Sequence, residues 1–154
     1  MKNVSSLLFA AAISMLCSSP VLAQDLFFFS APSRNINCIY DSGSVSAGKA
    51  SIRCDIGQFT PSLKTVPAQS KEEIEIIGRC TLAKMRAFVI EQDATATSTY
   101  CPTDAPISDQ QTILGYGSSL QRGGFTCTSE TSGMTCQNNR GHGFSLSRNL
   151  QKVF

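Results

Sequence analysis

The chain has a single histidine, His142, in the segment GHGFSLSR that ends at Arg148. An imidazole can act as base and acid near neutral pH, because its unperturbed pKa is about 6.5. With a nearby serine as nucleophile and a carboxylate to orient the ring, the sequence contains the components of a hydrolytic triad. The candidate partners of the histidine are Ser145, Ser147, Asp104 and Asp109.

Two observations disfavour a triad. Side chains alternate between the faces of an extended strand, so His142 and Ser145, three positions apart, would point to opposite sides. The chain also lacks the GxSxG pattern that exposes a nucleophilic serine on a sharp turn. We therefore predict no catalytic residue and no enzyme, and a small secreted hydrolase using His142 is the alternative.

Other catalytic and cofactor signals are weaker. Glycoside hydrolysis needs two suitably spaced carboxyl groups, and the candidates are Glu72, Glu73, Glu75, Glu91 and Asp93. A run of exposed glutamates is the simpler interpretation. No phosphate-binding glycine loop or dinucleotide fingerprint occurs, so the sequence predicts no cofactor.

The first residues have the pattern of an export signal. Lys2 precedes an uncharged, largely apolar run, and small residues at Val21 and Ala23 predict cleavage after Ala23. The run is too short and serine-rich for a membrane span of about 20 residues. A lipoprotein signal at Cys17 is disfavoured because no small residue precedes that cysteine in SMLC. We expect residues 1–23 to be a signal peptide and residues 24–154 a single domain, periplasmic or extracellular, with no transmembrane segment.

Removal of this peptide leaves six of the seven cysteines, an even number that indicates disulfides in an exported chain. Each sequential pair brackets a segment with turn residues near its middle. The predicted pairs are Cys38–Cys54, Cys80–Cys101 and Cys127–Cys136. No metal site is predicted, because the chain has no CxxC motif and only one histidine.

The charge of the chain argues against nucleic acid as a partner. Without Lys2 the remaining chain has 12 basic and 11 acidic residues, whereas a nucleic-acid-binding domain needs a strong basic surplus. Residues 122–154 are locally basic, but their four cations are spread along the segment. A solvated face is the preferred interpretation, and a patch for an anionic partner is the alternative.

Short apolar or alternating runs, separated by glycine, serine, asparagine or proline, predict a strand-rich domain. The run LFFFS predicts a strand, and a turn follows around Pro32 and Ser33. Two runs then place alternate apolar residues on one face of a hairpin. These residues are Ile36, Cys38 and Tyr40 on one strand and Ile52, Cys54 and Ile56 on the next.

Two more hairpins complete the plan. One spans residues 86–101 and turns at Gln92 and Asp93, and the other turns at Ser132 and Gly133. Residues 70–78 are ambiguous: Ser70, Glu73 and Gly78 fit a capped helical turn, which we favour, whereas Ile74 and Ile76 alternate as in a strand. The predicted fold is mainly β, a compact antiparallel sandwich or barrel of disulfide-stapled hairpins with at most one short helix.

The GHGFSLSR segment has a structural interpretation in this plan. NNRG would form a turn, and Gly141 and Gly143 would permit positive φ or close backbone approach beside His142. Phe144 and Leu146 would then face inward and the two serines outward. Tyr116, within GYG, is expected to be a half-buried aromatic residue with a hydrogen-bonded hydroxyl.

Several motifs in this order resemble a family of small exported bacterial proteins that is catalogued as a domain of unknown function. The motifs are FSAPSRNINCIY, SIRCDI, the spaced Cys80 and Cys101, LGYG, CTSETSGMTCQN and GHGFSLSR. The resemblance implies a secreted or periplasmic disulfide-bonded β domain, with no assigned activity or ligand. The chain departs from the family at CTLAKM, where relatives often carry an aromatic residue next to a glycine.

These observations favour a non-enzymatic binding module of the bacterial envelope, which would recognise a protein or glycan through loops on a rigid scaffold. An inhibitor of a cell-wall lytic enzyme is one specific form of this hypothesis, and a structural envelope protein is a further alternative. The candidate binding residues are Tyr116, Arg140, His142, Ser145 and Arg148.

Overall fold

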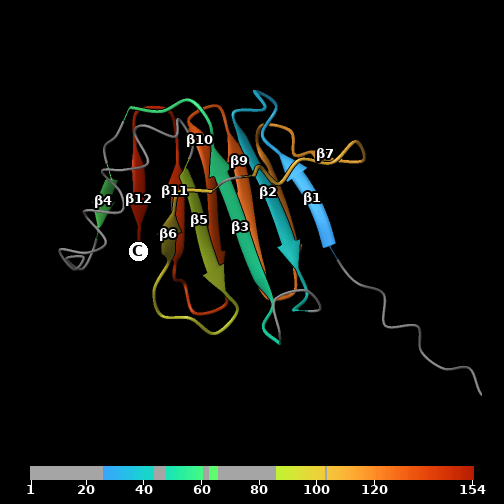
Figure 1. The fold of residues 1–154 in the computed structure, drawn as a ribbon, viewed down its shortest axis with the longest axis vertical. Helices are drawn as coiled ribbons and strands as arrows, with labels where there is room; N and C mark the ends of the chain where they lie inside the picture. The colour runs from blue at the N-terminus through green and yellow to red at the C-terminus, as the bar shows by residue number, and fades with distance from the viewer. Residues whose placement is uncertain (1–25, 44–47, 61–62, 66–85, 103) are drawn as a thin grey trace, which may run out of the picture.

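The computed structural model describes residues 26–43, 48–60, 63–65, 86–102 and 104–154. Twelve strands in these ranges form two six-stranded sheets that lie face to face (Figure 1). The first sheet has the order β6-β5-β3-β2-β1-β7, with β1 (Leu26–Ser30), β2 (Ile36–Asp41), β3 (Ser51–Ile56), β5 (Arg86–Glu91), β6 (Ser98–Tyr100) and β7 (Thr112–Ile113). The second has the order β4-β12-β11-β10-β9-β8, with β4 (Leu63–Thr65), β8 (Ser118–Arg122), β9 (Phe125–Glu130), β10 (Gly133–Asn138), β11 (Gly143–Leu146) and β12 (Gln151–Val153).

The fold is a β-sandwich, which is one of the two architectures that the sequence predicts. Both sheets are open, so the protein is not a closed barrel. Most neighbouring strands are antiparallel, but the edge strands β7 and β4 pair in parallel with β1 and β12. No helix occurs in the described ranges, and the ambiguous segment 70–78 lies outside them.

The alternation seen in the sequence forms the core. On β2 and β3, the predicted inward residues are at most 5% exposed. On β11, Phe144 and Leu146 are buried while Ser145 between them is partly exposed, as predicted. The sheets meet through aromatic contacts, including Phe88 with Phe144 at a centroid distance of 5.8 Å.

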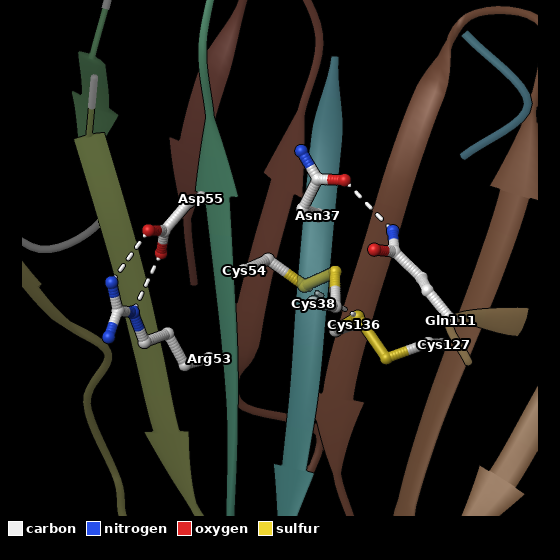
Figure 2. The surroundings of a disulfide bond; sticks show 8 residues. All are labelled: Asn37, Cys38, Arg53, Cys54, Asp55, Gln111, Cys127 and Cys136. Atoms are coloured by element: carbon white, nitrogen blue, oxygen red, sulfur yellow. Dashed lines mark hydrogen bonds and ion pairs between the residues drawn. A yellow bond between two sulfur atoms is a disulfide. The ribbon is translucent and has the colours of Figure 1, made fainter. Parts of the chain in front are cut away.

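Two predicted disulfides are confirmed, and each joins directly opposite residues of a hairpin. Cys38–Cys54 links β2 to β3, and Cys127–Cys136 links β9 to β10. The bridges stack across the centre of the core, with 3.8 Å between the Sγ atoms of Cys54 and Cys136 (Figure 2). Cys101 is also disulfide-bonded, but Cys80 lies outside the described residues, so the third pairing stays a prediction.

The segment between β6 and β7 connects opposite edges of the first sheet and crosses its outer face (Figure 1). We call its described residues 104–111 the strap. Arg53 on β3 donates to the carbonyl oxygen of Asp104 at 2.6 Å, and Gln111 donates to Asn37 at 2.9 Å. After β7, the buried Leu114 donates its amide to Ser30 at 2.9 Å. The strap and the Leu114–Ser30 hydrogen bond together fix the start of the loop that carries Tyr116.

Candidate functional site

All five predicted binding residues belong to the second sheet or its loops, but they lie at three separate places. Tyr116 and Arg148 line a recess at one end of the sandwich. Arg140 and His142 occupy the β10–β11 turn at the other end of the same strands. Ser145 lies between the two ends, on β11. The structure therefore joins only Tyr116 and Arg148 in one site.

The first site, which we call the Tyr116 recess, has a volume of about 340 Å³. Loops from four parts of the chain surround it, including the β1–β2 turn and the β9–β10 turn. Its polar side chains come from Ser33, Asn35, Tyr116, Glu130, Thr131, Ser132, Ser147, Arg148 and Asn149. An aromatic ring, both signs of charge and several hydrogen-bonding groups thus converge on one concavity.

Local hydrogen bonds hold the loops of this recess in place. Asn35 donates its side-chain amide to the Gln58 carbonyl oxygen at 2.9 Å and accepts from the Gln58 amide at 2.7 Å. The Ser147 hydroxyl accepts from the Leu150 amide at 3.0 Å. Gly117 donates its backbone amide to Ser129 at 2.7 Å. The recess is therefore preformed rather than dependent on a ligand for its shape.

Tyr116 is half-buried, as expected, and 47% of its surface remains exposed. Arg148 and Glu130 are exposed as well, and Ser132 donates to the Glu130 carboxylate at 3.1 Å. An exposed ring beside such groups can pack on an apolar surface of a ligand while the polar groups fix its orientation. This arrangement is suited to binding.

The residues of the conceivable triad are not assembled. The Ser145 hydroxyl is paired with Thr135 at 2.8 Å on the outer face of the second sheet. Asp104 lies on the outer face of the first sheet, where it contacts Arg53, and Asp109 lies in the strap on that same side. Among the described residues, no serine or carboxylate hydrogen-bonds to the His142 imidazole.

The paired-carboxylate candidates also do not form a site in the described residues. Glu72, Glu73 and Glu75 lie outside these residues. Glu91 is exposed and forms an ion pair with Lys49 at 3.7 Å, while Asp93 lies in the β5–β6 turn.

The basic residues of 122–154 do not gather into one patch. The Arg122 guanidinium lies over the rings of Phe27 and Tyr40, at 4.8 and 5.4 Å from their centroids. Lys152 lies over Phe154 at 5.7 Å. With Arg140 and Arg148 at opposite ends, the cations are dispersed as the solvated-face interpretation requires.

The sulfurs of Cys38, Cys54 and Cys136 lie within 4.8 Å of one another, a compact cluster of soft atoms. Zinc binds cysteine as the thiolate. Because each of these sulfurs is in a disulfide, none is a thiolate in this structure. The cluster is a structural centre of the core.

Asn138 is a buried residue that sequence reasoning missed. It is 4% exposed, and its side chain donates to the carbonyl oxygens of Glu91 and Ala94 at 3.1 and 2.8 Å. Its Oδ1 atom accepts from the amides of Arg140 and His142 at 3.0 and 3.1 Å. One amide thus shapes the β10–β11 turn and attaches it to the first sheet. The NNRG pattern indicated the turn, but not this contact across the sandwich.

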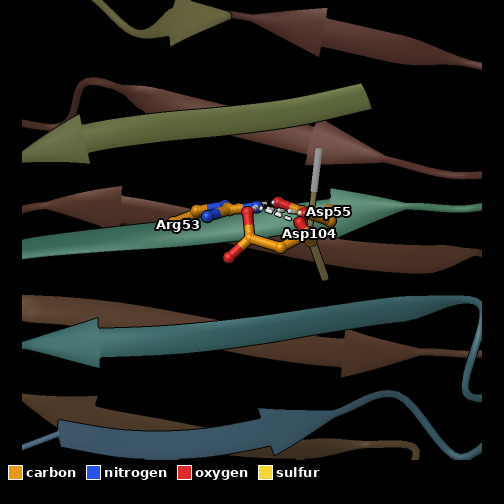
Figure 3. A network of polar contacts seen from close by, with 3 residues as sticks. All are labelled: Arg53, Asp55 and Asp104. Atoms are coloured by element: carbon orange, nitrogen blue, oxygen red, sulfur yellow. Dashed lines mark hydrogen bonds and ion pairs between the residues drawn. The ribbon is translucent and has the colours of Figure 1, made fainter. Parts of the chain in front are cut away.

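Arg53 and Asp55 form a second polar centre that the sequence did not reveal (Figure 3). Two guanidinium nitrogens of Arg53 contact the two carboxylate oxygens of Asp55 at 2.8 and 2.7 Å. Asp55 is 1% exposed, and burial raises the pKa of its carboxyl group while Arg53 opposes that shift. The hydrogen bond to Asp55 raises the pKa of Arg53, so the guanidinium stays charged beneath the strap.

Residues 9–154 match the family of unknown function DUF6636. The chain belongs to this family. No curated protein and no solved structure gives a significant match. Within the described part of the chain, no helix is long and apolar enough to span a membrane. Its disulfides are compatible with export to an oxidising compartment.

Proposed function

We propose that this DUF6636 protein is an exported, non-enzymatic binding module of the bacterial envelope, periplasmic or extracellular, whose ligand contacts the Tyr116 recess. The observation that carries the proposal is the exposed Tyr116 ring beside Arg148 and Glu130 in a preformed concavity. Ligand sites commonly combine such a concavity with a few convergent polar groups.

The partner class follows from the chemistry of the recess. Hydroxyl, amide and charged groups can hydrogen-bond to a sugar or to a polar protein side chain, and the Tyr116 ring can cover an apolar patch of either. Aromatic and arginine side chains are also enriched among residues that dominate binding energy at protein interfaces. The proposed partner is a protein or glycan of the envelope or exterior.

A specific form of the proposal is inhibition of a cell-wall lytic enzyme. Such enzymes use paired carboxylates, which favour a cation that enters their cleft. Arg148 is exposed on the β11–β12 loop at the rim of the recess, so it is the residue that we expect to enter the cleft.

The first experiment presents the oxidised protein, residues 24–154, to peptidoglycan sacculi and to a panel of muramidases. We expect saturable capture on sacculi or a concentration-dependent fall in a muramidase rate. Absence of both, with the protein shown to be folded, would contradict the proposal.

The hydrolase alternative is tested separately with His142→Ala. If the protein is a binding module, no hydrolysis of peptidoglycan or of ester and peptide substrates should depend on this residue. A turnover that His142→Ala abolishes in a folded protein would replace the binding proposal with the hydrolase.

A further inference from the structure

The two outer faces of the sandwich present different chemistry. On the first sheet, the strap crosses the outer face and hydrogen-bonds to Asn37 and Arg53. On the second sheet, the outward side chains of β8 to β11 remain partly or fully exposed. Among the described residues, none covers the outward side chains of β8 to β11, so this second face is accessible to a ligand.

A row of hydroxyl groups crosses this open face. Ser119, Thr128, Thr135 and Ser145 are consecutive partners in the register of β8, β9, β10 and β11. Ser119 pairs with Thr128, and Thr135 with Ser145, each at 2.8 Å between hydroxyl oxygens. Each pair uses one of its two hydroxyl protons, so a free donor and several acceptor sites remain for a ligand.

A second recess adjoins the hydroxyl row. It has a volume of about 600 Å³, and we call it the Gln137 recess. Gln121, Thr126 and Gln137 form its outer-face part and are again consecutive register partners, two positions along their strands from the hydroxyl row. Asn139, in the β10–β11 turn, supplies a further amide group.

The walls of the Gln137 recess are fixed by contacts to the other sheet. Asn138 attaches the β10–β11 turn to the carbonyl oxygens of Glu91 and Ala94. On the opposite wall, Arg122 stacks on rings of the first sheet. Gly123 adopts a φ of +54° in the β8–β9 turn, and a Cβ atom there would collide with the Tyr40 hydroxyl. These contacts hold the recess open without a ligand.

We propose that the hydroxyl row and the Gln137 recess form a binding surface for a neutral glycan chain. Hydroxyl and carboxamide groups offer donors and acceptors together, as a polyhydroxylated ligand requires. Among the described residues, no carboxylate lines the recess, and its one arginine is engaged with aromatic rings. The lining groups therefore match an uncharged, polyhydroxylated ligand, and Lys152, the register partner of Ser145, is the cation at the end of the hydroxyl row.

This site is independent of the Tyr116 recess. It lies at the end of the strands that carries the β8–β9 and β10–β11 turns, and it shares no lining residue with the Tyr116 recess. Because no exposed aromatic side chain lies in the two rows, we expect weak binding to a short oligosaccharide, with a Kd of about 1 mM. A long glycan would bind more tightly through repeated contacts.

The test is an NMR titration of the oxidised, ¹⁵N-labelled protein with a tetramer of N-acetylglucosamine and, separately, of glucose. We expect saturable shifts of amides in β8 to β11 with at least one tetramer. Absence of saturable shifts up to about 10 mM would overturn the proposal, since even millimolar affinity would be detected. Shifts confined to the Tyr116 recess would also overturn it, while leaving the proposed function in place.

Substitutions on each outer face test where the oligosaccharide binds. Gln137→Ala and Thr135→Val should each weaken binding at least threefold, and the valine keeps the shape and strand propensity of threonine. Gln110→Ala changes an exposed glutamine of the strap on the other face and should leave the affinity unchanged. If Gln110→Ala weakens binding as much as Gln137→Ala, in proteins with unchanged spectra elsewhere, the assigned surface is wrong.

Discussion

At the residue scale, Asn138 illustrates how one buried amide organises a turn that also carries candidate binding residues. Its four hydrogen bonds join two hairpin turns from different sheets. A buried polar group that loses its partner leaves desolvated donors and acceptors behind, so the cost of truncation exceeds that of one exposed hydrogen bond. The β10–β11 turn, which lines the Gln137 recess, consequently depends on the hydrogen bonds of this one buried side chain.

Asn138→Ala should therefore lower the free energy of unfolding by about 2–3 kcal/mol. The matched control is Asn139→Ala, because Asn139 is exposed in the same turn and should change stability by less than about 0.5 kcal/mol. Chemical denaturation measures both values. Equal effects of the two substitutions would contradict the role given to Asn138.

Asp55 makes stability depend on pH in a defined direction. Burial raises its pKa above the ordinary value of 3.8, so the folded protein binds a proton more readily than the unfolded chain. The contribution of Asp55 to the unfolding free energy should then be largest below pH 3.8 and fall as pH rises through the folded pKa.

Asp55→Asn removes this titration. The difference in unfolding free energy, wild type minus Asp55→Asn, should decrease as the pH rises from 3.8 toward neutral. Denaturation curves of both proteins across this range provide the measurement. A difference that grows with pH would show that Arg53 outweighs burial and lowers the pKa.

At the element scale, the β2–β3 and β9–β10 hairpins combine alternating burial with a cross-strand disulfide, and β10 and β11 approach each other closely. Gly143 begins β11, and a Cβ atom at this position would collide with the carbonyl oxygen of Cys136 on β10. The glycine is thus required by packing, whereas Gly141, with a φ of +78°, is required by the turn. Both features agree with the prediction from the sequence for the glycines on either side of His142.

Gly143→Ala should destabilise the protein by about 1–3 kcal/mol through overpacking. Gly115→Ala is the control, because a Cβ atom there would make an ordinary contact of 3.6 Å with Ser118. Thermal unfolding of the two variants should show a clear loss only for Gly143→Ala. An unperturbed Gly143→Ala protein would refute the tight approach of β10 and β11.

The disulfide pattern predicts which cysteine is bonded to Cys101. Cys101 is bonded, and the other two pairs join neighbouring cysteines in the sequence. Peptide mapping of the oxidised protein should therefore recover Cys80–Cys101. A bridge between Cys80 and any cysteine other than Cys101 would contradict the predicted pairing.

Removal of the Cys127–Cys136 bridge by double alanine substitution should lower the free energy of unfolding by about 2–4 kcal/mol.

The strands and the two bridges could be predicted from the sequence because they depend on neighbours in one hairpin. Period-two burial places Cys38 and Cys54 on the same face, and the antiparallel pairing of β2 with β3 brings them opposite each other. The position of the strap, its contact with the Arg53–Asp55 pair, and the hydrogen bonds from Asn138 to the first sheet all join distant segments of the chain. No local sequence pattern specifies such contacts. For the same reason, the sequence grouped Arg140 with Arg148, although the structure places them at opposite ends of two strands.

At the scale of the whole molecule, the sandwich is a rigid support with preformed surfaces. Its core is fastened by two stacked disulfides, one outer face is crossed by the strap, and recesses lie at opposite ends of the second sheet. Small domains stabilised in this way can present loops for binding without relying on a large core. We propose that the Tyr116 recess is the part of this support that contacts the envelope partner.

The most direct test of that claim is the affinity of the partner found on sacculi or among the muramidases for three variants of the oxidised protein. Tyr116→Ala and Arg148→Ala should each weaken binding by about tenfold or more, the effect of losing a principal contact worth about 1.4 kcal/mol. Arg140→Ala changes an arginine that is also exposed, at the opposite end, and should leave the affinity within about twofold. Loss of binding with Arg140→Ala, and none with Tyr116→Ala or Arg148→Ala, would contradict the account.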